Sequence, residues 1–474
     1  METDFKYIKN RIGEYKKQDL LEFCYDLLES KKDEEFPIWY IFIIMKWTYI
    51  FGGEKYPPKQ LTQERFARIY NATSNFNQGH ISAFLKDKRA DKAFQILYNQ
   101  QFYLQKSVTK EIYATQLKLY SKLKSKYDIE KSFKEKTGLS ILDFLFIEQI
   151  VWLYINIKEA KIPNLYFDGF LEAYVLNMFS QIMTVDKIAN FLSLLTLNPN
   201  NVNESISNFK HKLKTEELQT MEMSFFTMFP FQIYKDRIKL IHERIYNHTV
   251  NYYIFDFLKT NDEKFTTEFG YRLEKYIGLG LTEIAEQFKT ETELKKILPA
   301  ESKLVDFMVG NNIFIESKAT EIQAYPNVNP TDELIFTALE SSVFKAYFEQ
   351  LLTVSKTLNP NSENWGIIIT YKELFWSHFT KLFDIGKDRY KTSSDYLHLP
   401  PENVFIIDIY TWDKVVQIVK DKKATLLEIL QIAKKNNSSF DTSKQLFGMH
   451  LDIYYPMQLN LSYLQTEISE LNIK

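Results

Sequence analysis

The residues with the clearest chemical potential lie in the stretch LVDFMVGNNIFIESKAT, residues 304–320. Two apolar runs flank the Gly-Asn-Asn triplet at 310–312, and these residue types readily adopt the positive φ angles of a hairpin turn. A hairpin that turns at this triplet places Asp306 directly opposite Glu316. Because side chains alternate along a strand, Glu316 and Lys318 point the same way. We therefore expect two acids and one ammonium on one face of a sheet.

Two carboxylates facing each other at roughly 5 Å repel, so a paired strand with this arrangement needs a compensating charge. Mg²⁺ suits this role, since it binds one or two carboxylates together with water and phosphate oxygens. Lys318 could neutralise charge on a reacting phosphate or orient the attacking water. The alternative is a solvent-exposed hairpin that carries Asp306, Glu316 and Lys318 without function. The continuous apolar run at 313–315 favours a strand covered on both faces, where charges without a role are costly.

The elements around this hairpin alternate between helical and β-prone segments from about residue 262 onward. The pattern predicts a helix at 269–281, strands at 304–309, 313–319, 365–371 and 404–410, and a long helix at 332–356 that begins after Thr331 and stops at Asn359-Pro360. Apolar residues up to about 250 recur at helical spacing, as in residues 141–154. We expect a mainly α N-terminal region, residues 1–255 with a break near 198–208, followed by an α/β domain at 262–474.

This order of elements, with Asp on one strand and Glu-x-Lys on the next, resembles the catalytic core of the PD-(D/E)xK nuclease superfamily over roughly residues 262–420. The resemblance implies a restriction-endonuclease-like central mixed sheet flanked by helices. It implies that Asp306 and Glu316 bind Mg²⁺, with Mn²⁺ as an alternative ion, and that Lys318 is the catalytic lysine. The helical segment EFGYRLEKYIGLGL supplies Glu274 as an accessory acidic metal ligand.

Three further positions bear on this resemblance. Val305 stands where the family motif has proline, a common departure. Lys345 and Gln350 fall on the long helix where the family sometimes places a further polar group, and each is equally well explained as a solvated residue.

Bulk composition sets limits on other functions. Lys and Arg number 59 against 61 Asp and Glu, so no global field attracts polyanions and nucleic-acid contacts must be local. The single cysteine, Cys24, excludes an intrachain disulfide and a cysteine-based zinc site, which favours a cytoplasmic location. The N-terminus lacks the pattern of a secretory signal. The apolar run at 36–51 is too short to span a bilayer, so we expect a buried helix and no membrane segment.

Other patterns suggest nucleic-acid contacts more weakly. Residues 61–87 superficially resemble a helix-turn-helix, with GHISAFLKD as the reading helix, and this arrangement also arises in ordinary helical domains. Lysines and aromatic residues interleave between Lys106 and Lys136, as in a backbone-binding surface or, more simply, a solvated helix face. Arg237 and His242 have the Arg-x4-His spacing of HEPN-type ribonucleases. No GxxxxGK[ST] phosphate-binding loop is present, which argues against an NTPase.

The sequence therefore predicts a metal-dependent endonuclease that hydrolyses phosphodiester bonds, with DNA favoured over RNA as substrate and 5′-phosphate ends as the family's usual product. A large helical arm on such a nuclease resembles bacterial restriction or antiviral-defence effectors, which implies a second copy of the chain or another defence protein as partner. Two alternatives remain: a non-catalytic protein whose helical region binds nucleic acid or protein, and a metal-independent ribonuclease that uses Arg237 and His242.

Overall fold

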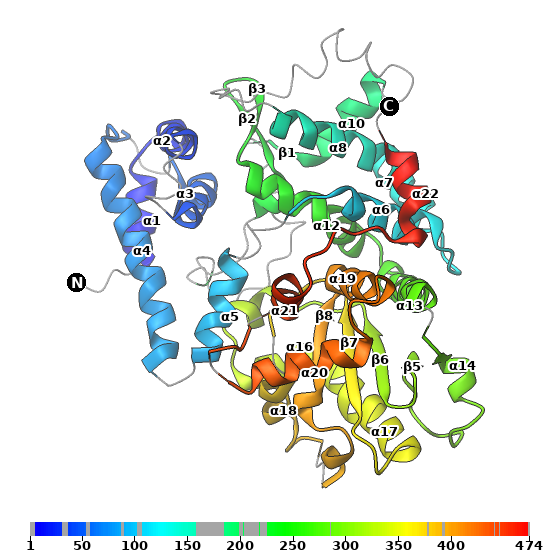
Figure 1. The fold of residues 1–474 in the computed structure, drawn as a ribbon. Helices are drawn as coiled ribbons and strands as arrows, with labels where there is room; N and C mark the ends of the chain where they lie inside the picture. Colours follow the sequence, from blue (N-terminus) through cyan, green and yellow to red (C-terminus); the bar gives the residue numbers. More distant parts are fainter. Residues whose placement is uncertain are drawn as a thin grey trace. The chain divides into compact units, whose positions relative to one another are not determined.

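The chain is mainly α-helical with an α/β part (Figure 1). It divides into two compact units. The computed structural model describes residues 5–30, 37–53, 57–86, 90–101, 107–157, 184–198, 202, 218, 225–284, 286–376, 379–390, 394–439, 441–444 and 446–472. The first unit comprises Met1–Val108, Glu130–Asp262 and Asn327–Pro330; the second comprises Thr109–Ile129, Glu263–Pro326 and Thr331–Lys474. The main division therefore falls at Asp262, and the second unit also takes in an earlier segment, Thr109–Ile129, that the sequence did not mark as separate.

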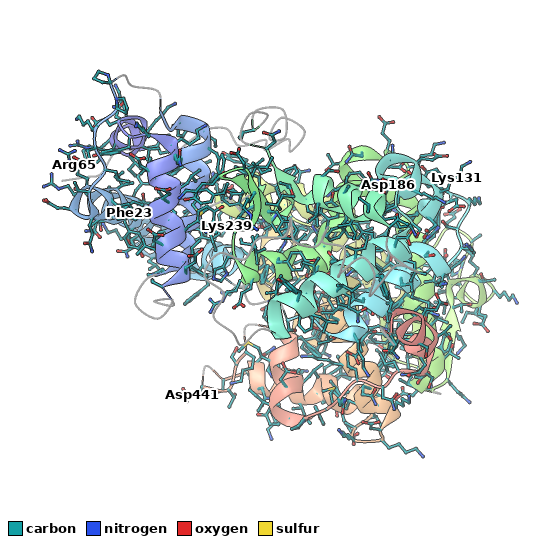
Figure 2. All side chains as sticks on the ribbon, turned by 90° about the horizontal axis from the view of Figure 1, so that it is seen from above. Phe23, Arg65, Lys131, Asp186, Lys239 and Asp441 are labelled. Atoms are coloured by element: carbon teal, nitrogen blue, oxygen red, sulfur yellow. The ribbon has the colours of Figure 1, made fainter. Side chains whose placement is uncertain are left out.

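The first unit is built from helices and one small sheet. Its helices are α1 (Phe5–Gly13), α2 (Lys17–Glu29), α3 (Ile38–Phe51), α4 (Gln63–Lys86), α5 (Ala90–Gln101), α7 (Ile129–Thr137), α8 (Ile141–Ile157), α10 (Val185–Leu195) and α12 (Glu243–Asn261), with a short 3-10 turn at Phe225–Thr227. Almost every residue of α3 is buried in one apolar core with α1, α2 and α4. Phe23 of α2, labelled in Figure 2, stacks on Phe66 of α4 with ring centroids 5.2 Å apart.

The predicted buried helix at residues 36–51 is confirmed by α3. In the described ranges no single helix has the length and apolar character needed to cross a membrane. One pair of helices, Ile129–Thr137 and Ile141–Ile155, passes the same criteria jointly, although the two are bent by 64° at their junction.

The N-terminal region is mainly helical, as predicted for residues 1–255, and it also contains one small sheet that the sequence did not predict. A three-stranded sheet contains β1 (Thr196–Leu197), β2 (Phe231–Tyr234) and β3 (Arg237–Leu240), with β2 antiparallel to β3. Lys235 and Asp236 form the turn at φ 50° and 60°. Two tyrosine hydroxyls, from Tyr25 and Tyr49, donate to the buried Gln232 side chain and tie this sheet to the helices. The predicted break near 198–208 falls largely outside the described residues.

The predicted helix-turn-helix at residues 61–87 is wrong. Residues Gln63–Lys86 form one continuous helix, α4, and its buried positions recur at helical spacing through the region expected to turn, at Phe66, Ile69, Thr73, Asn77, Ile81 and Phe84. Gly79 lies within this helix, and a side chain there would meet no other atom within 4 Å. The segment GHISAFLKD is therefore the C-terminal part of a packed helix and not a separate reading helix.

The second unit has a five-stranded mixed sheet at its centre, in the order β4-β5-β6-β7-β8. The strands are β4 (Phe288–Thr290), β5 (Phe307–Val309), β6 (Ile313–Lys318), β7 (Trp365–Thr370) and β8 (Val404–Asp408). Neighbouring strands are antiparallel from β4 to β6 and parallel from β6 to β8. The short strand β4 was not predicted. Strands β6 to β8 are buried along nearly their whole length, as the apolar run before Glu316 indicated.

Helices cover both faces of this sheet (Figure 1). The remaining elements of the unit are α6 (Lys110–Leu117), η2 (Lys118–Lys122), α13 (Phe265–Ile284), α14 (Glu291–Leu294), α16 (Asp332–Leu339), η7 (Glu340–Phe344), η8 (Ala346–Leu351), α17 (Leu352–Leu358), α18 (Phe379–Gly386), η9 (Ser394–His398), η10 (Pro401–Asn403), α19 (Ile409–Lys420), α20 (Leu426–Asn437), α21 (Phe447–Tyr454), η11 (Ser462–Leu464) and α22 (Gln465–Leu471), and α15 (Ala324–Val328) crosses the division between units. One face packs on the continuous helix from α16 to α17, in a core with Met308, Phe314 and Ile368.

The opposite face carries α13 and α19. These helices approach closely at Gly280, where a Cβ atom would lie 2.7 Å from the Trp412 indole nitrogen, so this position needs glycine. Gly278 lies beside the ring of Phe307 on β5. Helix α13, which carries Glu274, is thereby fixed to both α19 and the hairpin strand.

A buried hydrogen-bond network also holds α13 in place. Tyr276 of α13 and Tyr463 of η11 donate to the Asp413 carboxylate of α19 at 2.7–3.0 Å, and Thr115 of α6 lies 3.0 Å from the Tyr276 hydroxyl. Burial raises the pKa of Asp413 to about 7. The network connects four parts of the second unit that lie far apart in the sequence.

Candidate active site

The β5–β6 hairpin has the register that the sequence predicted. Val309 pairs with Ile313 and Phe307 pairs with Ile315 across an antiparallel ladder, and Gly310 takes a φ of +55° in the turn. Strand β5 is shorter than expected, since it begins at Phe307 and leaves Asp306 one residue before the strand. Asp306 still lies at the end of the ladder beside Glu316.

Hydrogen bonds from backbone amides and from the Ser317 hydroxyl connect Asp306 with the strand that carries Glu316. The Asp306 amide donates to Glu316 Oε2 at 3.1 Å. The Ser317 amide and hydroxyl both donate to Asp306 Oδ2, at 2.7 and 2.6 Å. Ser317 was not among the predicted site residues, and its role follows from its position beside Glu316 on the same strand. These bonds fix both carboxylates at one end of the hairpin.

Lys318 and Gln350 complete the network on the other side of Glu316. Lys318 Nζ donates to Glu316 Oε1 at 2.5 Å, and Gln350 Nε2 donates to the same oxygen at 2.7 Å. Gln350 also donates to the Leu304 carbonyl and accepts from Lys318. Glu316 is only 2% exposed. The structure therefore places Gln350 in the site, whereas Lys345 is exposed and outside these hydrogen bonds.

The electrostatic environment of the hairpin raises the pKa of both acids. Burial, followed by the negative charge of Asp306, raises the pKa of Glu316 to about 8. Burial also raises the pKa of Asp306, although the hydrogen bonds from Ser317 oppose this shift. The ammonium of Lys318 acts in the opposite direction on both acids. A bound cation would offset the remaining free-energy cost of burying the two carboxylates in their charged form.

These shifts predict a stability that depends on pH. Glu316 has an ordinary pKa of 4.5 and a folded-state pKa of about 8, so between these values the folded protein holds a proton that the unfolded chain has lost. The free energy of unfolding in EDTA should therefore fall as pH rises from about 5 to 8. Replacing Glu316 by Gln should make this decrease shallower, with Asp413 and Glu274 accounting for the remainder, whereas Glu301→Gln at an exposed position should leave it unchanged. Urea unfolding across this pH range measures the effect, and equal slopes in all three proteins would contradict it.

Glu274 of α13 and Glu291 of α14 lie close enough to add to the negative potential of the site. Burial, followed by the charges of Asp306 and Glu291, raises the pKa of Glu274 to about 7. The Glu291 amide donates to the Asp306 carbonyl at 2.8 Å, while its carboxylate pairs with Lys295. Sequence reasoning missed Glu291 because it begins the short helix α14, which directly follows the unpredicted strand β4.

The residues present fit a Mg²⁺ ion that keeps several water ligands better than one coordinated by protein groups alone. Within the described ranges, no three His, Cys, Asp or Glu side chains converge closely enough to bind one metal ion together. Glu274 as a third ligand therefore stays a prediction. Asp306 and Glu316 provide two hard carboxylates, and Mg²⁺ commonly takes one or two carboxylates with water and phosphate oxygens as its other ligands. Asp306 Oδ1 accepts no hydrogen bond from any described residue, which leaves that oxygen available to a cation.

The basic segment between Lys106 and Lys136 buries most of its aromatic rings, although Tyr127 is only half-buried. Tyr113, Tyr120 and Phe133 are at most 1% exposed. The Tyr120 hydroxyl donates to Tyr371 at 2.7 Å. Two of the lysines form ion pairs at 2.6 Å with glutamates of the C-terminal helix α22. Lys118 pairs with Glu467, and Lys122 pairs with Glu470. Much of this segment therefore has a packing role, and Lys106 lies outside the described residues.

Arg237 and His242 lie on different kinds of structure. Arg237 begins strand β3, while His242 is the N-cap of α12, where its Nδ1 accepts a hydrogen bond from the Arg244 amide at 3.1 Å. The end of strand β3 and the start of α12 lie between the two residues, so they are not presented by one regular element. The arrangement gives no support to the ribonuclease alternative.

Comparisons of the chain with models of known protein families, with curated proteins and with solved structures found no match to any of them.

Proposed function

We propose that this chain is a Mg²⁺-dependent nuclease that hydrolyses phosphodiester bonds, with DNA as the favoured substrate. The observation that carries the proposal is the convergence of Asp306, Glu316 and Lys318 at the end of one hairpin, where the Asp306 amide contacts Glu316 and the Lys318 ammonium contacts the same carboxylate. A buried acid pair without a functional cation would destabilise the sheet. The arrangement is therefore better explained by catalysis than by stability.

The order of elements supports a restriction-endonuclease-like fold for the second unit. Helix α13 carries Glu274, the hairpin carries Asp306 and then Glu316-x-Lys318, and the continuous helix from α16 to α17 leads into the parallel strand β7. This is the succession on which the resemblance to PD-(D/E)xK nucleases rests. The mixed sheet, antiparallel at the hairpin and parallel beyond it, is consistent with that fold.

In this proposal each residue has a separate task. Asp306 and Glu316 would hold the metal ion, with Glu274 adding negative potential from α13. A bound Mg²⁺ supplies Lewis acidity and lowers the pKa of water. Lys318 places its ammonium where it can neutralise charge on the phosphate or orient the attacking water. Gln350 bonds to both Glu316 and Lys318 and so keeps the two side chains in a fixed relation.

We further propose that the helical first unit binds the substrate, a second copy of the chain or a partner protein, and that the nuclease acts in bacterial antiviral defence. This part rests on the resemblance to defence effectors that combine a nuclease with a large helical region. The non-catalytic alternative predicts binding without cleavage, so one assay separates the two.

Incubation with supercoiled plasmid DNA tests the proposal. We expect nicked and linear products with Mg²⁺ or Mn²⁺ and intact plasmid in EDTA. Asp306→Asn should remove cleavage, while Asp388→Asn, the same chemical change at an exposed position of the second unit, should retain it. Products should carry 5′-phosphates that a ligase can join. Cleavage that continues in EDTA, or equal activity of the two variants, would refute the proposed site.

A further inference from the structure

A second feature with binding potential is an open cavity beside helix α20. It has a volume of about 320 Å³, within the usual range for small-ligand sites. Its lining residues are Lys423, Ala424, Glu428, Gln431, Ile432, Lys435 and Tyr455. None of these residues belongs to the proposed nuclease site. The cavity therefore calls for a separate explanation.

Helical spacing explains one wall of the cavity. Glu428, Gln431, Ile432 and Lys435 follow one another at intervals of three, one and three residues, which places them along one stripe of α20. Seven residues of helix extend over about 10 Å, so Glu428 and Lys435 lie near opposite ends of this stripe. The wall is consequently polarised, with a carboxylate at the N-terminal end and an ammonium at the C-terminal end.

Lys423, in the turn before α20, ties this part of the cavity to the segment that contains Tyr455. Its ammonium donates to the Pro456 carbonyl at 2.9 Å and lies 3.6 Å from the Asp421 carboxylate. These contacts fix the neighbouring Tyr455 beside the turn that leads into α20. Tyr455 and Glu428 line the same cavity, and burial, followed by the negative charge of Glu428, raises the pKa of Tyr455.

The polar side chains of the cavity differ in how many hydrogen bonds and ion pairs they form within the protein. Glu428 caps α20, since its Oε2 accepts from the Thr425 amide and hydroxyl at 2.7 and 2.9 Å. This leaves Glu428 Oε1 without a hydrogen bond from the described residues. The side chain of Lys435 is exposed and forms no hydrogen bond or ion pair with them. Adjacent Lys434 differs, because it pairs with Glu363 at 3.0 Å and lies over the Trp365 ring.

We propose that this cavity binds a nucleoside 5′-monophosphate unit, with its phosphate at Lys435 and an amino-bearing base between the Tyr455 ring and Glu428. A nucleotide matches the three features together: an anionic end, a planar ring and an exocyclic amino group. Carboxylates accept from the amino group of cytosine, and aromatic rings stack on any base. The unit belongs either to a free nucleotide or to a nucleic-acid strand. Binding does not depend on the proposed nuclease function.

Titration of the full-length chain in EDTA tests this proposal without cleavage. The probes are CMP, UMP, inorganic phosphate and a short fluorescein-labelled oligodeoxycytidine, measured by calorimetry and fluorescence anisotropy. CMP should bind more tightly than UMP or phosphate. Lys435→Ala and Tyr455→Ala should each weaken CMP or oligonucleotide binding by about tenfold. Lys434→Ala is the matched control and should leave the affinity unchanged.

Glu428→Gln tests the base contact directly. Glutamine can still complete the capping box of α20, so the helix should be retained while the preference for CMP over UMP is lost. Binding of the oligonucleotide with no binding of CMP would identify a strand as the source, provided that Lys435→Ala weakens it. Failure of both CMP and oligonucleotide to bind would overturn the proposal. Equal affinity for CMP and inorganic phosphate, or an equal effect of Lys434→Ala, would also overturn it.

Discussion

Replacing Lys318 by alanine is expected to lower the rate of plasmid cleavage by about 10²- to 10³-fold, the usual cost of removing one group that stabilises charge in a transition state. Lys318 contributes the ammonium that contacts Glu316, and its side chain is 20% exposed. Truncation therefore removes a positive charge without leaving a large buried void. Initial rates at saturating DNA and Mg²⁺ measure the effect on turnover, and circular dichroism checks that the fold is retained.

Lys420→Ala is a matched control for this loss. Lys420 lies on α19, is 28% exposed and forms an ion pair with Glu283 at 2.6 Å, so its burial and pairing resemble those of Lys318. We expect this variant to cleave within about twofold of the parent rate, since a partly exposed ion pair contributes little to stability. Cleavage by Lys318→Ala at the parent rate would exclude Lys318 from catalysis. An equal loss in both variants would point to a general effect of removing lysines.

The hairpin could be predicted from the sequence because its determinants are local. The Gly-Asn-Asn turn fixes the register, and the alternation of a strand then places Asp306 beside Glu316. The start of α16 was equally accessible, since the Thr331 side chain accepts from the Leu334 amide as an N-cap. In both cases residues within about ten positions decide the structure.

Gln350 and the segment Thr109–Ile129 could not be placed in this way. Gln350 reaches Glu316 across 34 residues, and its direction depends on the helical phase through η7 and η8, where the π-helical turns shift the usual spacing. The segment Thr109–Ile129 joins the second unit through contacts with α13 and α22 that no local pattern encodes. Tertiary packing decides both positions.

Helix α4 and the small sheet were not anticipated for a different reason, because their local sequence signals were misleading or weak. Gly79 and its polar neighbours favoured a turn, but the buried stripe from Phe66 to Phe84 continues through them and stabilises one helix. A glycine in a helix costs only about 1 kcal/mol, which this burial offsets. Strands β2 and β3 are only four residues long each and have no alternating burial, so no periodic pattern marked them.

Replacing Arg272 by methionine is expected to lower the free energy of unfolding of the second unit by about 3 to 5 kcal/mol. Arg272 is 1% exposed on α13 and donates to the carbonyls of Leu119, Tyr120 and Tyr127 and to the Ser125 hydroxyl, at 2.7–3.1 Å. Methionine preserves much of the apolar volume but leaves these buried acceptors without that donor. Urea unfolding followed by tryptophan fluorescence measures the change.

The control for this prediction lies one turn further along the same helix. Lys275 is exposed and donates a hydrogen bond to the Lys124 carbonyl at 2.6 Å, so Lys275→Met should change the free energy of unfolding by no more than about 0.5 kcal/mol. Similar unfolding midpoints for the Arg272 variant and the parent would mean that water replaces the guanidinium without penalty. A large loss confined to Arg272→Met would instead establish that η2 and α13 depend on this one side chain. Since α13 also carries Glu274, the same variant should then lose cleavage at temperatures where the parent remains active.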